Sequence, residues 1–361
     1  MSYIKKLTLH NFRNHTSIAI DATNLPYVIT GQNGAGKTSI LEAISLISPG
    51  KGLRNAKFSE ITNVTTNTPW SVETIINSHD DVIINTKLIE DSNRRCITID
   101  SKIVRHHQEL LEVASIIWLT PLMDQIFIGA TAIRRKFLDR LVFNLVSKSH
   151  ADDIIKYEDA MRDRLKLIKD QIRDNAWFDA LEYNMAVSGA KIAESRNKTL
   201  HLLNESSLTT NSNFPIPKLI IEGEIEEFAK HNSLNEVEDF FKEKLKASRK
   251  IDYINGRTNS GIHLSNLIVY YSCKNIRADL CSTGEQKALL LAIILAEARA
   301  KIALNNTRPI LLLDEVVAHL DSTRRNELFF EINKMKLQAW LTGTDPDIFS
   351  ALVNNAEFLE L

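Results

Sequence analysis

Short apolar runs bounded by turn-forming residues fill the first third of the chain. Runs of this length, rich in β-branched and aromatic residues, predict β-strands rather than helices. The predicted strands cover residues 4–9, 17–20, 27–30, 71–76, 82–88 and 96–99. Strand-like runs resume from Leu267. Two separated parts of the chain are therefore expected to form one strand-rich body.

The middle of the chain has a helical period instead. From Ile154 to Ile172 apolar residues recur at spacings of three and four, which places them on one face of a helix. A second such face runs from Phe178 to Ile192, and the polar stretch 173–175 separates the two. We predict two long helices packed as an antiparallel hairpin.

The hairpin is followed by less regular sequence. A stretch rich in Ser, Thr, Asn and Pro predicts a loop at 204–217, and an amphipathic pattern returns at 232–250. The simplest organisation is a strand-rich body formed by 1–120 and 263–361, with a helical arm, 121–262, inserted between them. A chain of 361 residues is long enough for both parts.

Residues 31–38 read GQNGAGKT and match the phosphate-loop pattern G-x-x-x-x-G-K-[ST]. A predicted buried strand at 27–30 precedes them and an apolar helical stripe at 40–47 follows, which is the setting that the motif needs. Glycines let backbone N–H groups point at phosphate oxygens, and the helix N-terminus adds partial positive charge. We expect ATP as the ligand, with Lys37 neutralising the β- and γ-phosphates and Thr38 binding Mg²⁺. The expected nucleotide-binding residues are Gly31, Gln32, Asn33, Gly34, Ala35, Gly36, Lys37, Thr38 and Ser39.

A wholly apolar run, 310–313, is followed directly by the carboxylates Asp314 and Glu315. Ligands bind at the carboxyl ends of parallel strands, so these acids are expected to face the phosphate loop. We expect Asp314 to hold Mg²⁺ through water and Glu315 to polarise the attacking water, with Lys37 as the second catalytic residue. For the dipeptide alone, two solvated acids after a core strand would be the better explanation; the upstream loop favours catalysis.

A Ser-Thr-Gly cluster at 282–284 precedes a long apolar helical run. First-turn N–H groups of a helix have no partner inside the helix, so such a cluster is chemically suited to anions. By itself it indicates only a helix N-cap.

The order of these elements resembles the ABC-type ATPases of DNA maintenance, and within them the RecF family of bacterial recombination mediators. The resemblance extends over nearly the whole chain. It is carried by LHNFRN at 9–14, GQNGAGKTSILEAI at 31–44, GATAIRRKFLDRL at 129–141, CSTGEQKALLLAIILAEA at 281–298 and ILLLDEVVAHLD at 310–321. The implied fold class is α/β: an ABC-type P-loop ATPase head with mixed sheets, plus an inserted α-helical arm subdomain.

The resemblance also assigns roles to residues. In the superfamily, the signature serine and glycine bind the γ-phosphate held by the opposite subunit, so Ser282 and Gly284, with Gln286, imply an ATP-dependent homodimer. Arg13 and Asn14 resemble nucleotide-contacting positions of related heads. The turn 318–321 looks like the family's D-loop at the dimer seam, and the strand 340–342 leads to its γ-phosphate sensor region.

Two segments depart from the family's pattern or are hard to place. The G-P-H-R-D-D-like stretch that usually precedes the signature is only partly kept at 260–266. A Q-loop position is assigned to Asp124 and Gln125. Neither segment belongs to the three phosphate-handling elements.

Charge restricts how a polyanion could bind. Lys and Arg total 44 against 45 for Asp and Glu, so no global charge attracts nucleic acid, and a DNA site must be a local patch. Two basic clusters are candidates for contacts with DNA phosphates: Lys51, Arg54 and Lys57, and Arg134, Arg135, Lys136 and Arg140. For each cluster taken separately, a solvated helix face is an equally good explanation.

The cysteines and the apolar runs bear on location. Cys96, Cys273 and Cys281 have no zinc-site spacing, which fits a reducing compartment without a structural metal. The N-terminal stretch has no signal-peptide apolar region, and no run approaches the ~18 apolar residues that span a bilayer. A cytoplasmic protein without a membrane partner is expected.

The leading hypothesis is a weak, slow DNA-dependent ATPase whose product is a conformational state, an ATP-closed dimer clamped on DNA. By resemblance it would act at gapped or stalled replication DNA, at single-strand/double-strand junctions, and help RecR and RecO load recombinase. The alternative, an SMC-like chromosome-tethering ATPase, needs a coiled coil of hundreds of residues or a zinc hook. A nuclease of the OLD type needs more chain after Glu315, and a transporter ATPase ordinarily lacks so long a helical insertion.

Overall fold

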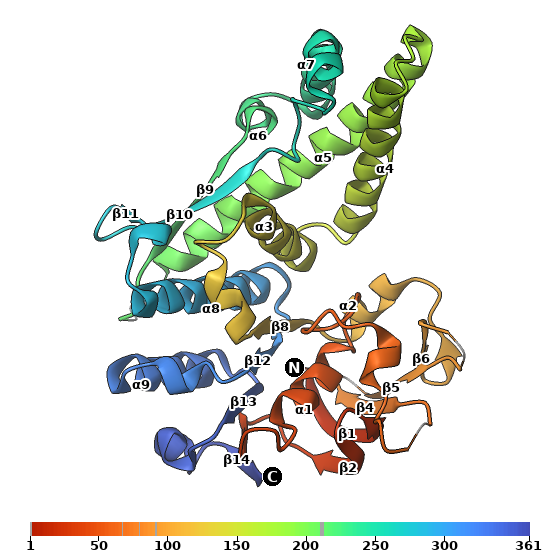
Figure 1. The fold of residues 1–361 in the computed structure, drawn as a ribbon. Helices are drawn as coiled ribbons and strands as arrows, with labels where there is room; N and C mark the ends of the chain where they lie inside the picture. Colours follow the sequence, from red (N-terminus) through yellow and green to blue (C-terminus); the bar gives the residue numbers. More distant parts are fainter. Residues whose placement is uncertain (1, 67, 79, 91, 210–212) are drawn as a thin grey trace. The chain divides into compact units, whose positions relative to one another are not determined.

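The computed structural model describes residues 2–66, 68–78, 80–90, 92–209 and 213–361. The chain forms two compact units. The first contains the described residues of 2–124, 213–214 and 290–361, and the second contains 125–209 and 215–289. Figure 1 shows the elements of both, which are described separately below.

An antiparallel sheet with the strand order β2-β1-β4-β5-β6-β7 makes up part of the first unit. All the strands predicted before residue 100, apart from 27–30, lie in it and are confirmed. The strands are β1 (Tyr3–Phe12), β2 (His15–Asp21), β4 (Ser71–Asn77), β5 (Asp81–Leu88), β6 (Arg95–Ile99) and β7 (Lys102–Ile103). Its buried face alternates with exposed positions, as expected for a sheet covered on one side.

A parallel sheet with the order β14-β3-β13-β12-β8 forms the rest of the strand framework of this unit. Its central strands are buried at every position, because parallel strands are covered on both faces and select continuous apolar runs. The strands are β3 (Tyr27–Thr30), β8 (Ile116–Leu119), β12 (Ile310–Leu313), β13 (Ala339–Gly343) and β14 (Glu357–Glu360). The predicted strands 27–30 and 310–313 are thus confirmed.

Helix α1 (Lys37–Ser45) lies in the core between these sheets. Ile40 and Leu41 of α1 belong to one apolar cluster with Leu7 of β1 and with Leu312 and Trp340 of the parallel sheet. Short 3-10 turns connect several of the strands. The other α-helices of this unit are α2 (Leu110–Val113), α9 (Ser322–Met335) and the part of α8 (Thr283–Asn305) from residue 290 onward.

The second unit is built on the predicted helical hairpin. Helices α4 (His150–Lys169) and α5 (Asn175–Leu208) are joined by a short turn and lie side by side (Figure 1). Tyr157 of α4, Met185 of α5 and Phe241 of α7 share one apolar cluster. The remaining helices are α3 (Thr131–Leu145), α6 (Glu224–Ala229) and α7 (Leu234–Asn255). Within the described residues, no helix is long and apolar enough to cross a membrane.

A small antiparallel sheet of order β11-β10-β9 completes the second unit. Its strands are β9 (Pro217–Glu222), β10 (Asn266–Tyr271) and β11 (Ile276–Arg277). Because β10 pairs with β9 along its whole length, residues 263–289 fall in this unit, although sequence analysis assigns them to the head. Compact units are not the same as a head and an arm, so the predicted boundaries between head and arm stay a prediction.

The loop expected at 204–217 is wrong at its start. Helix α5 continues to Leu208, because the Asn204 amide pairs with the backbone of Leu219 on β9. Asn204 donates to the Leu219 carbonyl at 2.9 Å and accepts from the Leu219 N–H at 2.8 Å. A polar residue that sequence analysis places in a loop thus fastens a helix to a strand. Residues 210–212 of this segment lie outside the described part of the chain.

The segment 260–266 belongs to a buried polar network of the second unit. Arg196, which is 2% exposed, donates to the Asp139 and Glu226 carboxylates and to the carbonyl of Ile262. His263 Nδ1 lies 2.7 Å from the Tyr157 hydroxyl. Desolvation raises the pKa of Tyr157 and lowers that of His263. In this chain the segment therefore has a structural role inside the arm-bearing unit.

Candidate nucleotide-binding site

The phosphate loop joins β3 to α1, and all three of its glycines, Gly31 included, have a positive φ. Gly34 has φ +88° and Gly36, the N-cap of α1, has φ +104°. A Cβ at Gly36 would overlap the His15 ring, so only glycine fits there. The first N–H groups of α1 have no partners within the helix and open on the loop. The loop is thus built to receive an anion.

Lys37 is buried and folded back over the loop. Its ammonium donates to the carbonyl of Gly31 at 2.8 Å and to that of Gln32 at 2.9 Å. A fixed cation beside the helix N-terminus adds to the positive potential of the loop. This geometry suits the β- and γ-phosphates that sequence analysis assigns to Lys37.

The carboxylate of Asp314 meets Thr38, as the motifs predict. Thr38 Oγ1 on α1 donates to Asp314 Oδ1 at 2.8 Å, at the end of β12. Hydroxyl and carboxylate oxygens are the ligands that Mg²⁺ prefers, so this pair fits the metal of a bound nucleotide. Glu315 follows with φ +54°, which is uncommon for a residue with a side chain, and it lines the same cleft as Thr38. Glu315 therefore lines the cleft from an uncommon, left-handed backbone conformation.

Thr342, on β13 between the two motif strands, is a site residue that sequence analysis does not single out. Its buried hydroxyl donates to Asp314 Oδ1 at 2.9 Å and accepts from the N–H of Glu315 at 2.9 Å. It therefore orients both carboxylate residues at once. The signals in the sequence are its place near the end of a strand of the same sheet and the resemblance of 340–342 to the strand that leads to the family's γ-phosphate sensor region.

The β1–β2 hairpin forms a second wall of the loop. Asn14 donates to the Gly34 carbonyl at 3.1 Å and accepts from the Ser39 hydroxyl at 3.1 Å. Arg13 makes a two-pronged ion pair with Glu42 of α1, at 2.8 and 2.6 Å, and donates to the Glu60 carbonyl. Asn14 thus touches the phosphate loop itself, whereas Arg13 holds the helix that follows it. Their contact with a nucleotide stays a prediction.

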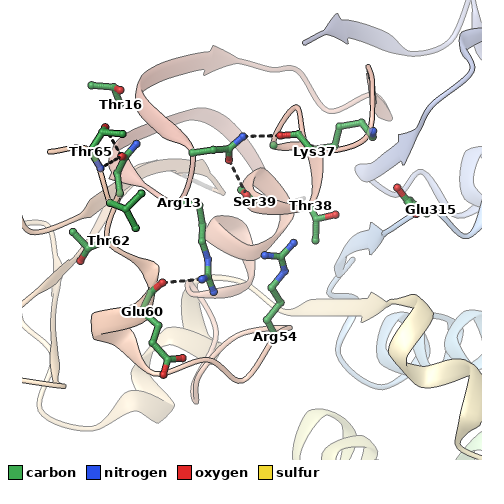
Figure 2. A pocket seen from close by; sticks show the side chains of 15 residues that line it. Arg13, Thr16, Lys37, Thr38, Ser39, Arg54, Glu60, Thr62, Thr65 and Glu315 are labelled. Carbon is green, nitrogen blue, oxygen red and sulfur yellow. Dashed lines mark hydrogen bonds between the residues drawn. The ribbon is translucent and has the colours of Figure 1, made fainter. Parts of the chain in front are cut away.

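A cleft of about 680 Å³ opens beside the loop, within the range of small-molecule sites. Figure 2 shows Lys37, Thr38 and Ser39 on one side of it and Glu315 across from Thr38. The 62–65 stretch and Thr16 form the outer wall. Arg54 also lines the cleft, and one of its guanidinium nitrogens lies 3.6 Å from a Glu42 oxygen.

Ser282, Gly284 and Gln286 lie at the start of α8, in the second unit. Ser282 Oγ donates to Glu285 Oε2 at 2.9 Å, and the Ser282 N–H donates to the same oxygen. Gln286 Nε2 donates to the Cys281 carbonyl at 3.1 Å. The predicted helix start is therefore confirmed, while its role as a signature for a second subunit stays a prediction.

The basic cluster of α3 has structural contacts. Arg134 donates to Asn266 Oδ1 at 2.8 Å and to two backbone carbonyls, and Arg135 donates to the Ser265 carbonyl at 3.0 Å. These residues fasten α3 to the segment before β10. They are weaker candidates for DNA phosphates than the exposed Lys51 and Lys57. No group of three potential metal-binding His, Cys, Asp or Glu residues occurs in the described ranges.

An antiparallel and a parallel sheet meet at a phosphate-loop helix, and Asp-Glu follows another strand of the parallel sheet. These features define the class of SMC-like, ABC-type ATPase heads. The family model described as the RecF/RecN/SMC N terminal domain matches residues 3–355. The chain is 40% identical to the DNA replication and repair protein RecF of Mesorhizobium japonicum over 99% of its own length and 96% of that protein. It is 39% identical to RecF of Rickettsia prowazekii, with 99% of each chain covered. The chain belongs to the RecF family.

Solved structures agree on the fold. A structure of the recombination mediator protein RecF-ATPrS in the RecFOR pathway matches with a TM-score of 0.85 at 22% identity, covering 100% of this chain and 96% of that one. An Smc head domain from Pyrococcus furiosus, bound to the C-terminal domain of ScpA, matches with a TM-score of 0.55 at 17% identity, covering 97% and 92%. The expected fold class, an ABC-type P-loop ATPase head with an inserted helical arm, is confirmed.

Proposed function

We propose that this chain is an ATP-dependent DNA-binding protein of recombinational DNA repair and replication restart. Two copies close over ATP and clamp gapped DNA at a single-strand/double-strand junction. The clamped state promotes recombinase loading, and slow hydrolysis of ATP releases it. The observation that carries the proposal is the joining of Thr38, Asp314, Thr342 and Glu315 into one network beside the phosphate loop.

The residues divide the chemistry as follows. The loop amides and Lys37 hold the phosphates, while Thr38 and Asp314 hold Mg²⁺, Asp314 through water. Glu315 polarises the water that attacks the γ-phosphate. Ser282, Gly284 and Gln286 of the second copy complete the site, which makes hydrolysis depend on dimerisation.

Family membership supports the choice of partners and location. The relatives are called DNA replication and repair proteins, and the similar structures are described as belonging to the RecFOR pathway. RecR and RecO are accordingly the proposed protein partners, and the cytoplasm is the proposed location. The exposed Lys51 and Lys57 supply a first choice of phosphate contacts on DNA.

Tethering of chromosomes in the manner of SMC proteins is less well supported. The longest arm helix, α5, has 34 residues. At a rise of 1.5 Å per residue it extends about 50 Å, far less than a tethering coiled coil.

The test measures oligomeric state and affinity for a single-strand/double-strand junction with ATP, ADP or no nucleotide. Wild type should dimerise and bind the junction more tightly only with ATP. Glu315→Gln should keep the ATP dimer and slow hydrolysis by about 100-fold or more, since the water loses its polarising base. Lys37→Ala should abolish ATP-driven dimerisation. If ATP neither dimerises wild type nor strengthens junction binding, the clamp is refuted.

A further inference from the structure

Glu285 lies three positions after Ser282, in the first turn of α8, and both its oxygens are engaged. Oε2 accepts from the N–H and from the hydroxyl of Ser282, each at 2.9 Å. Oε1 accepts from the Lys274 ammonium at 2.5 Å. Lys274 lies in the turn between β10 and β11, so the hairpin and the helix start are joined through this one carboxylate.

The carboxylate is ionised at all physiological pH values. The hydrogen bond from Lys274, followed by those from Ser282, lowers the pKa of Glu285 to about 2. The same pair raises the pKa of Lys274, so its ammonium is charged as well. The Glu285 side chain is 20% exposed and that of Lys274 is 51% exposed, so an approaching group can reach both charges.

These charges matter for the phosphate that Ser282 is proposed to bind. The Ser282 hydroxyl has one hydrogen, which it donates to Glu285 in this structure. To bind a γ-phosphate it must donate that hydrogen to a phosphate oxygen instead. A carboxylate at this position repels the same phosphate unless a cation offsets it. Lys274 is placed to do so. Arg277 of the same hairpin pairs with Asp279 instead, with 3.0 Å between Arg277 Nε and Asp279 Oδ1.

We propose that Lys274 is a positioning residue for ATP-driven dimerisation: it neutralises Glu285 and holds it as the cap of Ser282, so that the helix start accepts the γ-phosphate carried by a second copy of this chain. The inference rests on the proposed function. It adds to the signature a cation from the hairpin, outside the S-x-G-x-Q motif.

The test compares wild type with Lys274→Met, Lys274→Arg, Glu285→Gln and the double variant Lys274→Met/Glu285→Gln. Dimerisation with ATP is followed by sedimentation, and monomer ATP affinity by titration with a fluorescent ATP analogue. Lys274→Met should weaken the ATP dimer by about tenfold, because an uncompensated like charge now faces the phosphate. Monomer ATP affinity should not change, and Lys274→Arg should stay near wild type.

The double variant separates electrostatics from structure. If Lys274 acts by neutralising Glu285, removing that charge should restore most of the lost dimerisation. Arg277→Met is the matched control, because it removes a cation from the same hairpin but leaves Glu285 paired. An equal loss in this control, or a double variant as weak as Lys274→Met, would overturn the inference.

Wild type itself distinguishes the two levels of the argument. If it fails to dimerise with ATP, the proposed function fails and the inference with it. If wild type dimerises and Lys274→Met dimerises equally well, only the inference is overturned.

Discussion

Thr342 contacts both acidic residues that follow β12 through a single hydroxyl. It is buried on β13, which separates β3 from β12 in the sheet. The hydroxyl gives its hydrogen to Asp314 and receives one from the N–H of Glu315. If Asp314 holds Mg²⁺ as proposed, Thr342 is placed to fix the orientation of its carboxylate.

Thr342→Val keeps the shape of the side chain and removes the hydroxyl. Asp314 then loses one of its two hydroxyl donors, so Mg²⁺-dependent hydrolysis of ATP should fall by about 10- to 100-fold. Single-turnover hydrolysis over a range of Mg²⁺ concentrations measures the effect. Thr342→Ser retains the hydroxyl and should recover most of the activity. A valine variant with wild-type turnover would show that Thr342 has no orienting role.

Sequence analysis finds residues that belong to contiguous motifs, including the distant pair Thr38 and Asp314, and misses contacts that no motif marks. The phosphate loop and the Asp-Glu pair are contiguous motifs, so their residue types reveal their chemistry. Thr342 and Asp314 are 28 positions apart, and Arg13 and Glu42 are 29 apart. No local pattern marks such pairs, because their spacing is set by the connections between strands.

Elements show the same division. Strands and long helices could be predicted, since apolar periodicity reports which face is buried. The end of α5 could not, because Asn204 prefers a loop locally and is satisfied here by a distant strand. The membership of β10 in the second unit depends likewise on its pairing with β9. The cluster at Arg134 and Arg135 is basic in sequence but structural in the fold.

The phosphate-loop helix is held by two arginines from outside the helix. Just past the middle of the helix, Arg13 pairs with Glu42, whose side chain is fully buried. Beyond its C-terminus, the buried Arg95 of β6 donates to the carbonyls of Leu46 and Ser48. A cation at a helix C-terminus is favourable because of the helix dipole. The position of the loop therefore depends on contacts outside the motif.

Glu42→Gln tests how much the Arg13 ion pair contributes to stability. The substitution leaves a partly buried guanidinium without a counter-charge, so the free energy of unfolding should drop by about 3 kcal/mol. Urea unfolding followed by circular dichroism measures it. Glu60→Gln is the control, since that side chain is exposed and lies 3.6 Å from Lys57; it should change stability by less than about 0.5 kcal/mol. Similar values for both variants would contradict the assignment.

At the scale of the whole molecule, the elements that we propose to handle phosphate are divided between the two compact units. The phosphate loop, Asp314 and Glu315 lie in the first, and Ser282, with the Glu285–Lys274 pair, lies in the second. Under the proposed function, each chain binds ATP with its first unit and completes the site of another chain with its second. In a symmetric dimer this gives two composite sites.

Mixing two inactive variants tests this arrangement directly. Lys37→Ala should have a defective phosphate loop and an intact signature, whereas Ser282→Arg should bind ATP as a monomer and block the signature. Alone, neither should dimerise or hydrolyse ATP. A mixed dimer places the intact loop of one chain opposite the intact signature of the other, so it contains one working site.

An equimolar mixture should therefore recover up to about half of wild-type turnover on a junction substrate, because neither variant pairs with itself, so every dimer is mixed and has one of two sites. Mixing Lys37→Ala with the double variant Lys37→Ala/Ser282→Arg is the control and should stay inactive, since no intact loop is present. If the complementing mixture is equally inactive while Ser282→Arg still binds ATP as a monomer, the two halves do not complete each other across the dimer. Recovery would instead mean that each ATP is bound by the phosphate loop of one chain and contacted by the signature of the other.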